Sequence, residues 1–246
     1  MRLNPRFSAR FGVLVPFTNT NLEPDMQHLA PSDVGIYAER LGGYDVDEIP
    51  DDTQMAGLGA ADLTEPLRLI EGARPDVILY GCTSATLTHG PSFDRSLAEK
   101  IRASSGAQSV TAAGALVHAA RTLELSKIAF ASPYVDAIND KAIAFLADEG
   151  VETVSRADIG RELGNYGQGE LTPDEVYALG LEANTSDAQA IVLSCTDMRS
   201  VEVIDRLEAA AGKPVICSNQ AMMFQALELI GRTPERGCGT LMQVAA

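Results

Sequence analysis

The sequence predicts an α/β fold built from two pseudo-symmetric halves, each with a parallel sheet of the flavodoxin-like type and with a cleft between them. Two observations carry this prediction. Short, uniformly apolar runs alternate with helical patterns, and the order of these features repeats once along the 246 residues. Runs that are apolar throughout are typical of parallel strands covered on both faces, and their alternation with helices is typical of βαβ units.

The apolar runs place six strands along the chain, at residues 11–16, 76–81, 109–112, 127–132, 190–194 and 214–218. Clear helical patterns lie between them, at residues 64–73, 136–150 and 172–183. Gly150 suits the left-handed conformation that follows many helix ends. Thr172, Pro173 and Glu175 match a capping box with proline at the first helical position.

The same motifs then recur in the second half. Pro16 ends the first strand of one half and Pro133 follows the first strand of the other, and the two lie 117 residues apart, while Cys82 and Cys195 lie 113 residues apart. Each cysteine follows an apolar strand, with Gly or Ser before it and Thr after it. Such a repeated order indicates duplication.

We therefore predict two domains related by a pseudo-two-fold axis. The first comprises residues 1–112 with 220–246, and the second comprises residues 113–219. Each half ends in a helical pattern, at 114–122 and 220–230, that can cross to the other domain. The cleft between them would be lined by the carboxyl ends of both sheets, where parallel sheets usually bind ligands.

The composition argues against several classes of protein. The net charge of −15 opposes binding to nucleic acid or to anionic membranes. No apolar run approaches ~18 residues, so we expect no membrane-spanning helix. The first apolar run stops at Pro16 and is interpreted as a strand rather than a signal peptide, so a cytoplasmic location is expected. The four cysteines form no CxxC pair and the three histidines lack ligand spacing, so no metal site is expected.

Cys82 and Cys195 are the candidate catalytic residues. One cysteine at a strand end is most often a buried structural thiol. Two cysteines at matching strand ends of a duplicated fold would face one cleft from opposite sides, which packing alone does not require. Cys217 and Cys238 have no such counterparts, so structural roles are expected for them.

The residues after each cysteine extend this site. Thr83, Ser84 and Thr196 would lie at helix N-termini, where backbone N–H groups lower a thiol pKa or hold a substrate carboxylate or an enolate oxygen. Asp197 would either add negative charge beside Cys195 or serve as an N-cap.

Three further residues lie on turns at the same sheet edges. Asn19 follows the first strand, where it could cap the next helix or donate to a substrate carboxylate. Tyr134 holds the matching place in the second half, where its hydroxyl could donate or its ring could pack. Asn165 lies in the Gly-rich segment 162–173, as a turn residue or as part of a lid.

Five motifs spread over nearly the whole chain carry a family resemblance: VPFTNTNLE, ILYGCTSATLTHG, ASPYVDAINDKAIAFLADEG, LSCTDMRS and PVICSNQAMMFQAL. The chain resembles the aspartate/glutamate racemase superfamily, within the branch of maleate cis-trans isomerases and arylmalonate decarboxylases. In that branch the decarboxylase keeps only the second cysteine and has glycine at the first, so Cys82 matches isomerases and racemases. The carboxylate-binding Asn, the substrate-binding Tyr and the lid Asn would fall on Asn19, Tyr134 and Asn165. Phe17 and the TSATL stretch depart from the maleate isomerase pattern.

The resemblance implies a cofactor-independent isomerase of a small dicarboxylate, most closely a maleate cis-trans isomerase. Cys82 would be the nucleophile and Cys195 the acid/base, with no metal, flavin or pyridoxal phosphate. The alternatives are a two-cysteine racemase of an acidic amino or hydroxy acid, an arylmalonate-type decarboxylase, and a non-catalytic small-molecule binding protein. The expected partner is a small carboxylate. The oligomeric state is left open, with a homodimer as the working expectation.

Overall fold

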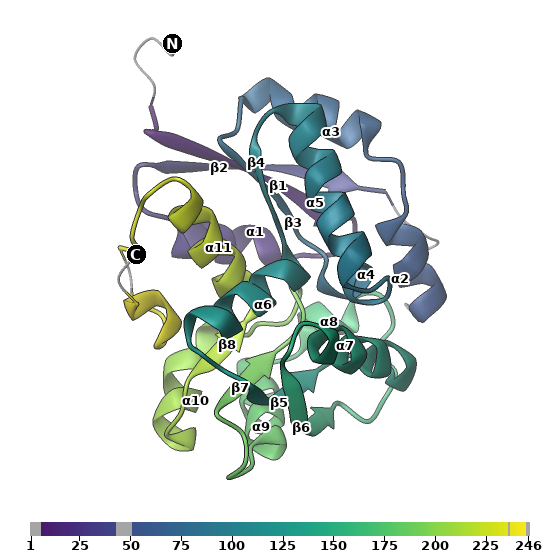
Figure 1. The fold of residues 1–246 in the computed structure, drawn as a ribbon, viewed down its shortest axis with the longest axis vertical. Helices are drawn as coiled ribbons and strands as arrows, with labels where there is room; N and C mark the ends of the chain where they lie inside the picture. Colours follow the sequence, from purple (N-terminus) through teal and green to yellow (C-terminus); the bar gives the residue numbers. More distant parts are fainter. Residues whose placement is uncertain (1–5, 43–50, 236, 245–246) are drawn as a thin grey trace.

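The structure is a computed structural model that describes residues 6–42, 51–235 and 237–244. Two four-stranded sheets, in the orders β2-β1-β3-β4 and β6-β5-β7-β8, form the two halves of the molecule (Figure 1). Every strand pair is parallel, and the two orders correspond strand for strand. The predicted α/β fold with two similar parallel-sheet halves is therefore confirmed.

The first sheet consists of β1 (Ala9–Pro16), β2 (Val34–Leu41), β3 (Val77–Tyr80) and β4 (Gln108–Thr111). The second consists of β5 (Lys127–Ser132), β6 (Glu152–Asp158), β7 (Ala190–Leu193) and β8 (Val215–Cys217). All six strands expected from the apolar runs are present. The central strands β3 and β7 are buried along their whole length, which explains their uniformly apolar sequences.

β2 and β6 were not predicted from the sequence; each is one of the two edge strands of its sheet, the other being β4 or β8. Both carry polar or charged residues, such as Glu39 in β2 and Arg156 in β6, and most positions in β6 are only partly buried. An edge strand faces solvent along one side, so it does not need the uniformly apolar run by which the inner strands were found.

The described helices are, in chain order, α1 (Leu22–Leu29), α2 (Asp52–Gly59), α3 (Thr64–Ile70), α4 (Thr83–Leu87), α5 (Pro91–Ser105), α6 (Ala112–Thr122), α7 (Asp136–Asp148), α8 (Gly167–Glu170), α9 (Pro173–Ala183), α10 (Ile204–Ala211) and α11 (Ser218–Leu229). The expected helix at 64–73 is α3 followed by a 3-10 turn. Gly150 lies just beyond α7 with φ of 86°. The capping box of Thr172 and Glu175 is formed at the start of α9, as predicted.

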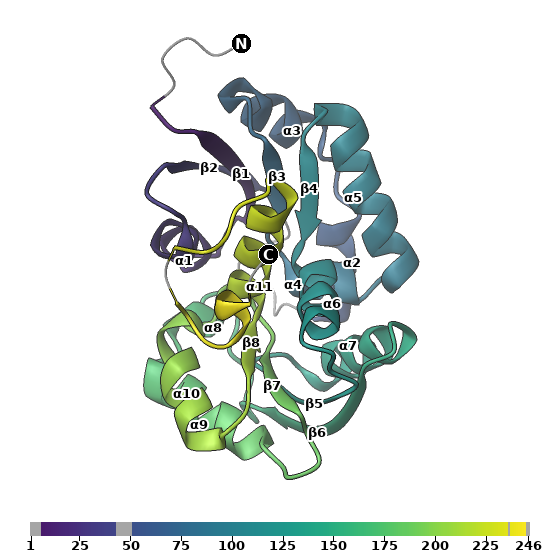
Figure 2. The same cartoon turned by 60° about the vertical axis from the view of Figure 1, so that its left-hand side comes forward.

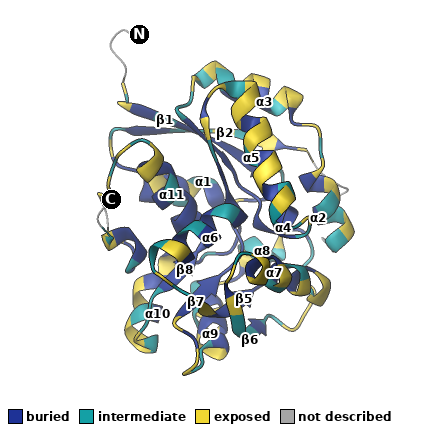
Figure 3. Ribbon diagram, viewed as in Figure 1, coloured by how far each residue is buried: buried dark blue, intermediate teal, exposed yellow. Residues whose placement is uncertain are grey.

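Helices α6 and α11 pack against each other between the two sheets (Figure 2). The strands are mostly buried, whereas the outward face of α5 is exposed (Figure 3). The two sheets fall within the two predicted domains, but the exact division of the chain, with α11 assigned to the first domain, stays a prediction. Among the described residues, no helix is both long enough and apolar enough to cross a membrane.

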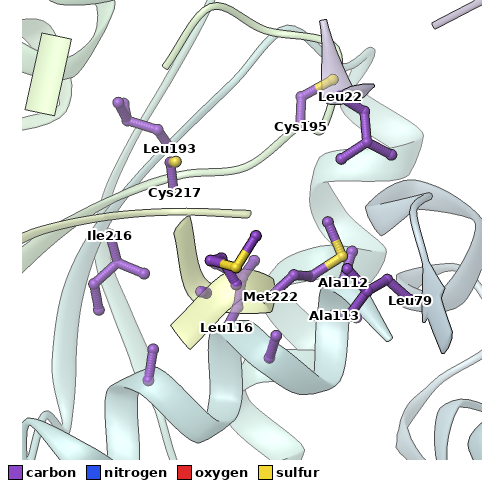
Figure 4. Close-up of a cluster of buried hydrophobic side chains, with 14 of the residues drawn as sticks. Leu22, Leu79, Ala112, Ala113, Leu116, Leu193, Cys195, Ile216, Cys217 and Met222 are labelled. Carbon is purple, nitrogen blue, oxygen red and sulfur yellow. The ribbon is translucent and has the colours of Figure 1, made fainter. Parts of the chain in front are cut away.

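Cys217 and Cys238 are both buried free thiols. Cys217 belongs to the apolar cluster that also holds Leu116, Leu193 and Met222 (Figure 4). Its sulfur accepts the backbone N–H of Gln220 at 3.4 Å and so caps α11. These contacts fit the structural role expected for Cys217.

Candidate active site

Each sheet brings two functional turns together at its centre. β1 lies beside β3 and β5 lies beside β7, at the points where the strand order reverses. Asn19 follows β1 and Cys82 follows β3, while Tyr134 follows β5 and Cys195 follows β7. Such a switch point is where open parallel sheets bind ligands, because the loops diverge there and leave a crevice.

A small cavity of about 40 Å³ lies where the two switch points meet. All eight residues predicted for the site line it: Asn19, Cys82, Thr83, Ser84, Tyr134, Asn165, Cys195 and Thr196. A larger hollow of about 500 Å³ lies beside α2 and shares Leu58 with this cavity. The larger hollow is lined by neither cysteine, so the smaller cavity is the candidate active site.

The sulfur of Cys82 is surrounded by hydrogen-bond donors. Its Sγ lies 3.7 Å from the Ser84 hydroxyl, which also lies 3.0 Å from the sulfur of Met55 and donates to it. Burial raises the pKa of Cys82 above its ordinary value, while the backbone N–H groups of Ala85 and Ser84 and the Ser84 hydroxyl lower it in part. The hydroxyl can rotate its proton to whichever sulfur needs a donor.

The sulfur of Cys195 has a different environment. Its thiol donates to Oε1 of Gln168 at 3.5 Å and accepts the backbone N–H of Asp197 at 3.4 Å. Burial, followed by the negative charge of Asp197, raises the pKa of Cys195 to about 12. Cys195 is therefore a thiol rather than a thiolate at neutral pH.

The two cysteine turns are tied to the other half of the molecule through threonine hydroxyls. Thr196 donates to the carbonyl of Gly81 at 2.8 Å, directly before Cys82, and accepts from Nδ2 of Asn19 at 3.0 Å. Thr83 donates to the hydroxyl of Ser218 at 3.0 Å, at the start of α11. Both hydroxyls donate their protons to groups of the protein itself, and these hydrogen bonds hold the two halves together.

Asn19 contacts both the start of α1 and the cavity. Its Oδ1 accepts the backbone N–H of Leu22 at 2.9 Å and that of Asn21 at 3.1 Å, at the start of α1. Its amide nitrogen reaches Thr196 in the other half, and the residue is buried against the cavity. Asn19 therefore accepts N–H groups at the start of α1, from two residues before the N-cap residue Asn21, and lines the candidate site at the same time.

Tyr134 and Asn165 enter the cavity from the second half. The Tyr134 hydroxyl lies 3.4 Å from that of Ser194, and burial followed by the nearby cysteines raises its pKa well above the ordinary value. Tyr134 thus keeps its proton and can donate it in a hydrogen bond. Asn165 is buried just before α8, in the Gly-rich segment 162–173.

Asp197 does not cap a helix of its own turn. Its Oδ1 accepts the backbone N–H groups of Thr20 at 2.9 Å and Asn21 at 3.2 Å, in the other half of the molecule. Burial raises the pKa of Asp197 to about 6, so the group is ionised at neutral pH. The sequence predicted its negative charge beside Cys195 correctly, but not this contact across the interface.

Gln168 and Met55 also line the cavity, and neither was predicted from the sequence. Gln168 lies three residues after Asn165 in the same Gly-rich segment, and that proximity was the available signal. Met55 lies on the short helix α2, and nothing in its sequence neighbourhood indicated a place near Cys82.

Comparisons with known proteins fit this geometry. The model of the arylmalonate decarboxylase family matches residues 11–242. The chain belongs to this family. The maleate isomerase of Nocardia farcinica is 28% identical over 250 residues, which cover 95% of each chain. The arylmalonate decarboxylase of Bordetella bronchiseptica is 27% identical over 233 residues, covering 89% of this chain and 86% of the relative.

Among solved structures, the family fold recurs closely in the Nocardia farcinica maleate cis-trans isomerase. The similar structure is that of a cysteine-to-serine mutant with a covalently bound succinylcysteine intermediate. It superposes with a TM-score of 0.86 at 25% identity, covering 96% of this chain and 99% of that one. The family to which this chain belongs thus spans decarboxylases and isomerases on one fold.

Proposed function

We propose that this protein is a cofactor-independent cis-trans isomerase of a small cis-dicarboxylic acid such as maleate. The observation that carries the proposal is the pair of cysteines lining one cavity at matching strand ends. The succinylcysteine in the similar isomerase supports it, because that adduct is what a thiolate forms on a four-carbon alkene diacid.

In the proposed reaction, the Cys82 thiolate adds to one alkene carbon and the Cys195 thiol gives its proton to the neighbouring carbon. The former double bond is then a single bond, and rotation about it brings the two carboxylates from cis to trans. The Cys195 thiolate takes back the proton, the C–S bond breaks, and Cys82 leaves as a thiolate. Atoms and charge balance without an added reagent, so no cofactor is required.

The residues around the cavity suit a carboxylate substrate held by neutral donors. No lysine, arginine or histidine is among the described residues that line it. Asn19, Tyr134 and Asn165 supply amide and hydroxyl donors, and hydrogen bonds to a charged acceptor are about twice as strong as neutral ones. We propose that these three residues bind the two substrate carboxylates.

The presence of Cys82 favours the isomerase over the decarboxylase activity of the same family. A decarboxylase needs one proton donor, which Cys195 alone would supply, and the resemblance places glycine at the first cysteine in that enzyme. A two-base racemase would also use both thiols. The proposal further places the protein in a reducing compartment such as the cytoplasm, because all four cysteines are free thiols.

Proton NMR in deuterated water tests the reaction class. Maleate, the enantiomers of aspartate and glutamate, and an arylmalonate would each be incubated with the protein. We expect conversion of maleate to fumarate. Exchange of the α-proton of an amino acid without alkene isomerisation would establish the racemase instead, and loss of CO₂ from the malonate would establish the decarboxylase.

Intact-protein mass spectrometry then tests the division of roles. With maleate, Cys195→Ser should retain a covalent adduct with the mass of one substrate, because water can supply the proton for the carbon next to the new C–S bond while no thiolate remains to remove it. Cys82→Ala should show no adduct and no turnover. Cys217→Ala is the matched control, since Cys217 caps α11 and does not line the cavity. An adduct that survives Cys82→Ala would contradict the proposed nucleophile.

A further inference from the structure

The two cysteine turns differ in chemistry at one matching position. Cys82 is followed by Thr83 and Ser84, whereas Cys195 is followed by Thr196 and Asp197. The residue two places after each cysteine therefore carries a hydroxyl in one half and a carboxylate in the other. Both residues line the cavity, and both are buried.

The contacts of the two sulfurs follow this difference. Cys82 faces a hydroxyl that can donate to a thiolate, with Ser84 Oγ at 3.7 Å. Cys195 faces the amide oxygen of Gln168 at 3.5 Å, which accepts a proton from a thiol and repels a thiolate. The carboxylate of Asp197 adds a further negative charge on the Cys195 side.

Asp197 is held in place by the opposite half of the molecule. Its Oδ1 accepts the N–H groups of Thr20 and Asn21 at 2.9 and 3.2 Å, and Nδ2 of Asn21 donates to it at 3.2 Å. The same Asn21 amide donates to the carbonyls of Asp197 at 2.7 Å and Gly169 at 3.0 Å. Gly169 adjoins Gln168, so one side chain fixes both groups that act on Cys195.

We propose that Asp197 is a positioning residue that keeps Cys195 protonated and so makes it the acid of the pair, leaving Cys82 to become the thiolate. The naming of acid and nucleophile rests on the proposed isomerase function. The physical asymmetry of the two thiols does not, because it follows from the hydroxyl of Ser84 and the carboxylate of Asp197.

The other charged groups around Asp197 leave this asymmetry in place. Arg40, on β2, lowers the pKa of Asp197 and keeps it ionised. Asp25, on α1, has a pKa raised to about 7, chiefly by burial, and it is held by Nδ2 of Asn219 at 2.7 Å. The charge of Asp197 is the second cause, after burial, that raises the pKa of Cys195. At Cys82 its effect is smaller than those of burial and of two hydrogen bonds, from the backbone N–H of Ala85 and the hydroxyl of Ser84.

The test is the pH dependence of alkylation at each cysteine in the substrate-free protein. Iodoacetamide would be applied across pH 6 to 11, and peptide mass spectrometry would give separate rates for Cys82 and Cys195. We expect Cys82 to be alkylated faster than Cys195 throughout this range. In Asp197→Asn, which keeps an oxygen acceptor for Thr20 and Asn21, the alkylation rate of Cys195 should rise at least about tenfold and that of Cys82 by less.

Two further variants separate charge from folding. Asp94→Asn removes another buried carboxylate with a pKa of about 6 that does not line the cavity, and should leave both alkylation rates unchanged. Ser84→Asp places a carboxylate at the matching position of the first half and should slow the alkylation of Cys82, even if Asp197→Asn does not fold. An unchanged Cys195 rate in Asp197→Asn, or a Cys82 rate unmoved by Ser84→Asp, would overturn the proposal. Alkylation needs no substrate, so these results stand apart from the NMR test of isomerisation.

Discussion

The chain after β3 and the chain after β7 begin alike and then diverge. Cys82 is followed at once by the helix α4, which starts at Thr83 and presents its first N–H groups to the sulfur. After Cys195 the backbone stays irregular until the 3-10 turn that begins at Val201. The same strand-Cys-Thr frame therefore supports two different thiol environments.

This difference shows how a duplicated fold can serve a reaction that is not symmetric. The parallel sheets place the two sulfurs at equivalent strand ends, and this part of the site is shared by both halves. The local turn then decides how readily each sulfur gives up its proton. Addition to an alkene needs one thiolate and one thiol, so a symmetric pair of turns would serve it less well.

The largest effect is expected when the turn after Cys82 is made to resemble the turn after Cys195. In Ser84→Asp, a buried carboxylate about 4 Å from Cys82 would disfavour its thiolate by roughly 3 to 4 kcal/mol at an effective dielectric constant near 20. We expect kcat to fall about 10²- to 10³-fold at pH 8. Steady-state rates with maleate measure this, and Ser84→Ala, which only removes the hydroxyl, should lose much less. Equal losses in the two variants would mean that charge at this position is not decisive.

The sequence predicted the parts of this comparison that local patterns encode. The buried strands were recognisable in the sequence as apolar runs, and the repeated order of motifs predicted that Cys82 and Cys195 lie at matching strand ends. The edge strands β2 and β6 carry no such run, because solvent along one side relaxes the demand for apolar residues.

The contacts across the interface were less predictable. Asp197 binds Thr20 and Asn21 from a turn about 176 residues away in the sequence, and Gln168 reaches Cys195 from the short helix α8. No local pattern encodes such pairs, since they depend on how the two halves are placed. The charge of Asp197 was visible in the sequence, whereas its anchoring required the structure.

A milder substitution tests whether Asn19, in the turn after β1, binds the substrate or only stabilises the start of α1. Asn19→Ala should raise KM and lower kcat, with kcat/KM reduced about 10-fold, because a carboxylate loses one neutral donor. It should also cost roughly 1 kcal/mol of stability through the lost cap of α1.

Asn19→Asp separates the two effects. It keeps the oxygen that accepts from Leu22 and Asn21, so thermal stability should stay near that of the unmodified protein. Its charge would repel a substrate carboxylate, so kcat/KM should fall at least as far as in Asn19→Ala. Unchanged kinetics in both variants would leave Asn19 with the capping role alone.

The smallest expected effect concerns Asp94, on α5, which does not line the cavity but shares its burial and raised pKa with Asp197. Burial is the main cause that raises the pKa of Asp94 from 3.8 to about 6. The folded protein therefore binds this proton more tightly than the unfolded chain does. The stabilising contribution is complete below pH 3.8 and is lost as the pH rises through 6.

Asp94→Asn should thus be more stable than the unmodified protein at pH 8, by about 1 to 3 kcal/mol at most, and should gain nothing near pH 4. Thermal unfolding followed at both pH values measures the difference. Asp148→Asn, at an exposed position on α7, is the matched control and should leave Tm unchanged at either pH. If Asp94→Asn changed Tm equally at both pH values, the effect would come from altered packing or hydrogen bonding. The different effects of Asp197 and Asp94 would then be explained by their positions relative to Cys195 rather than by the cost of burying a charge.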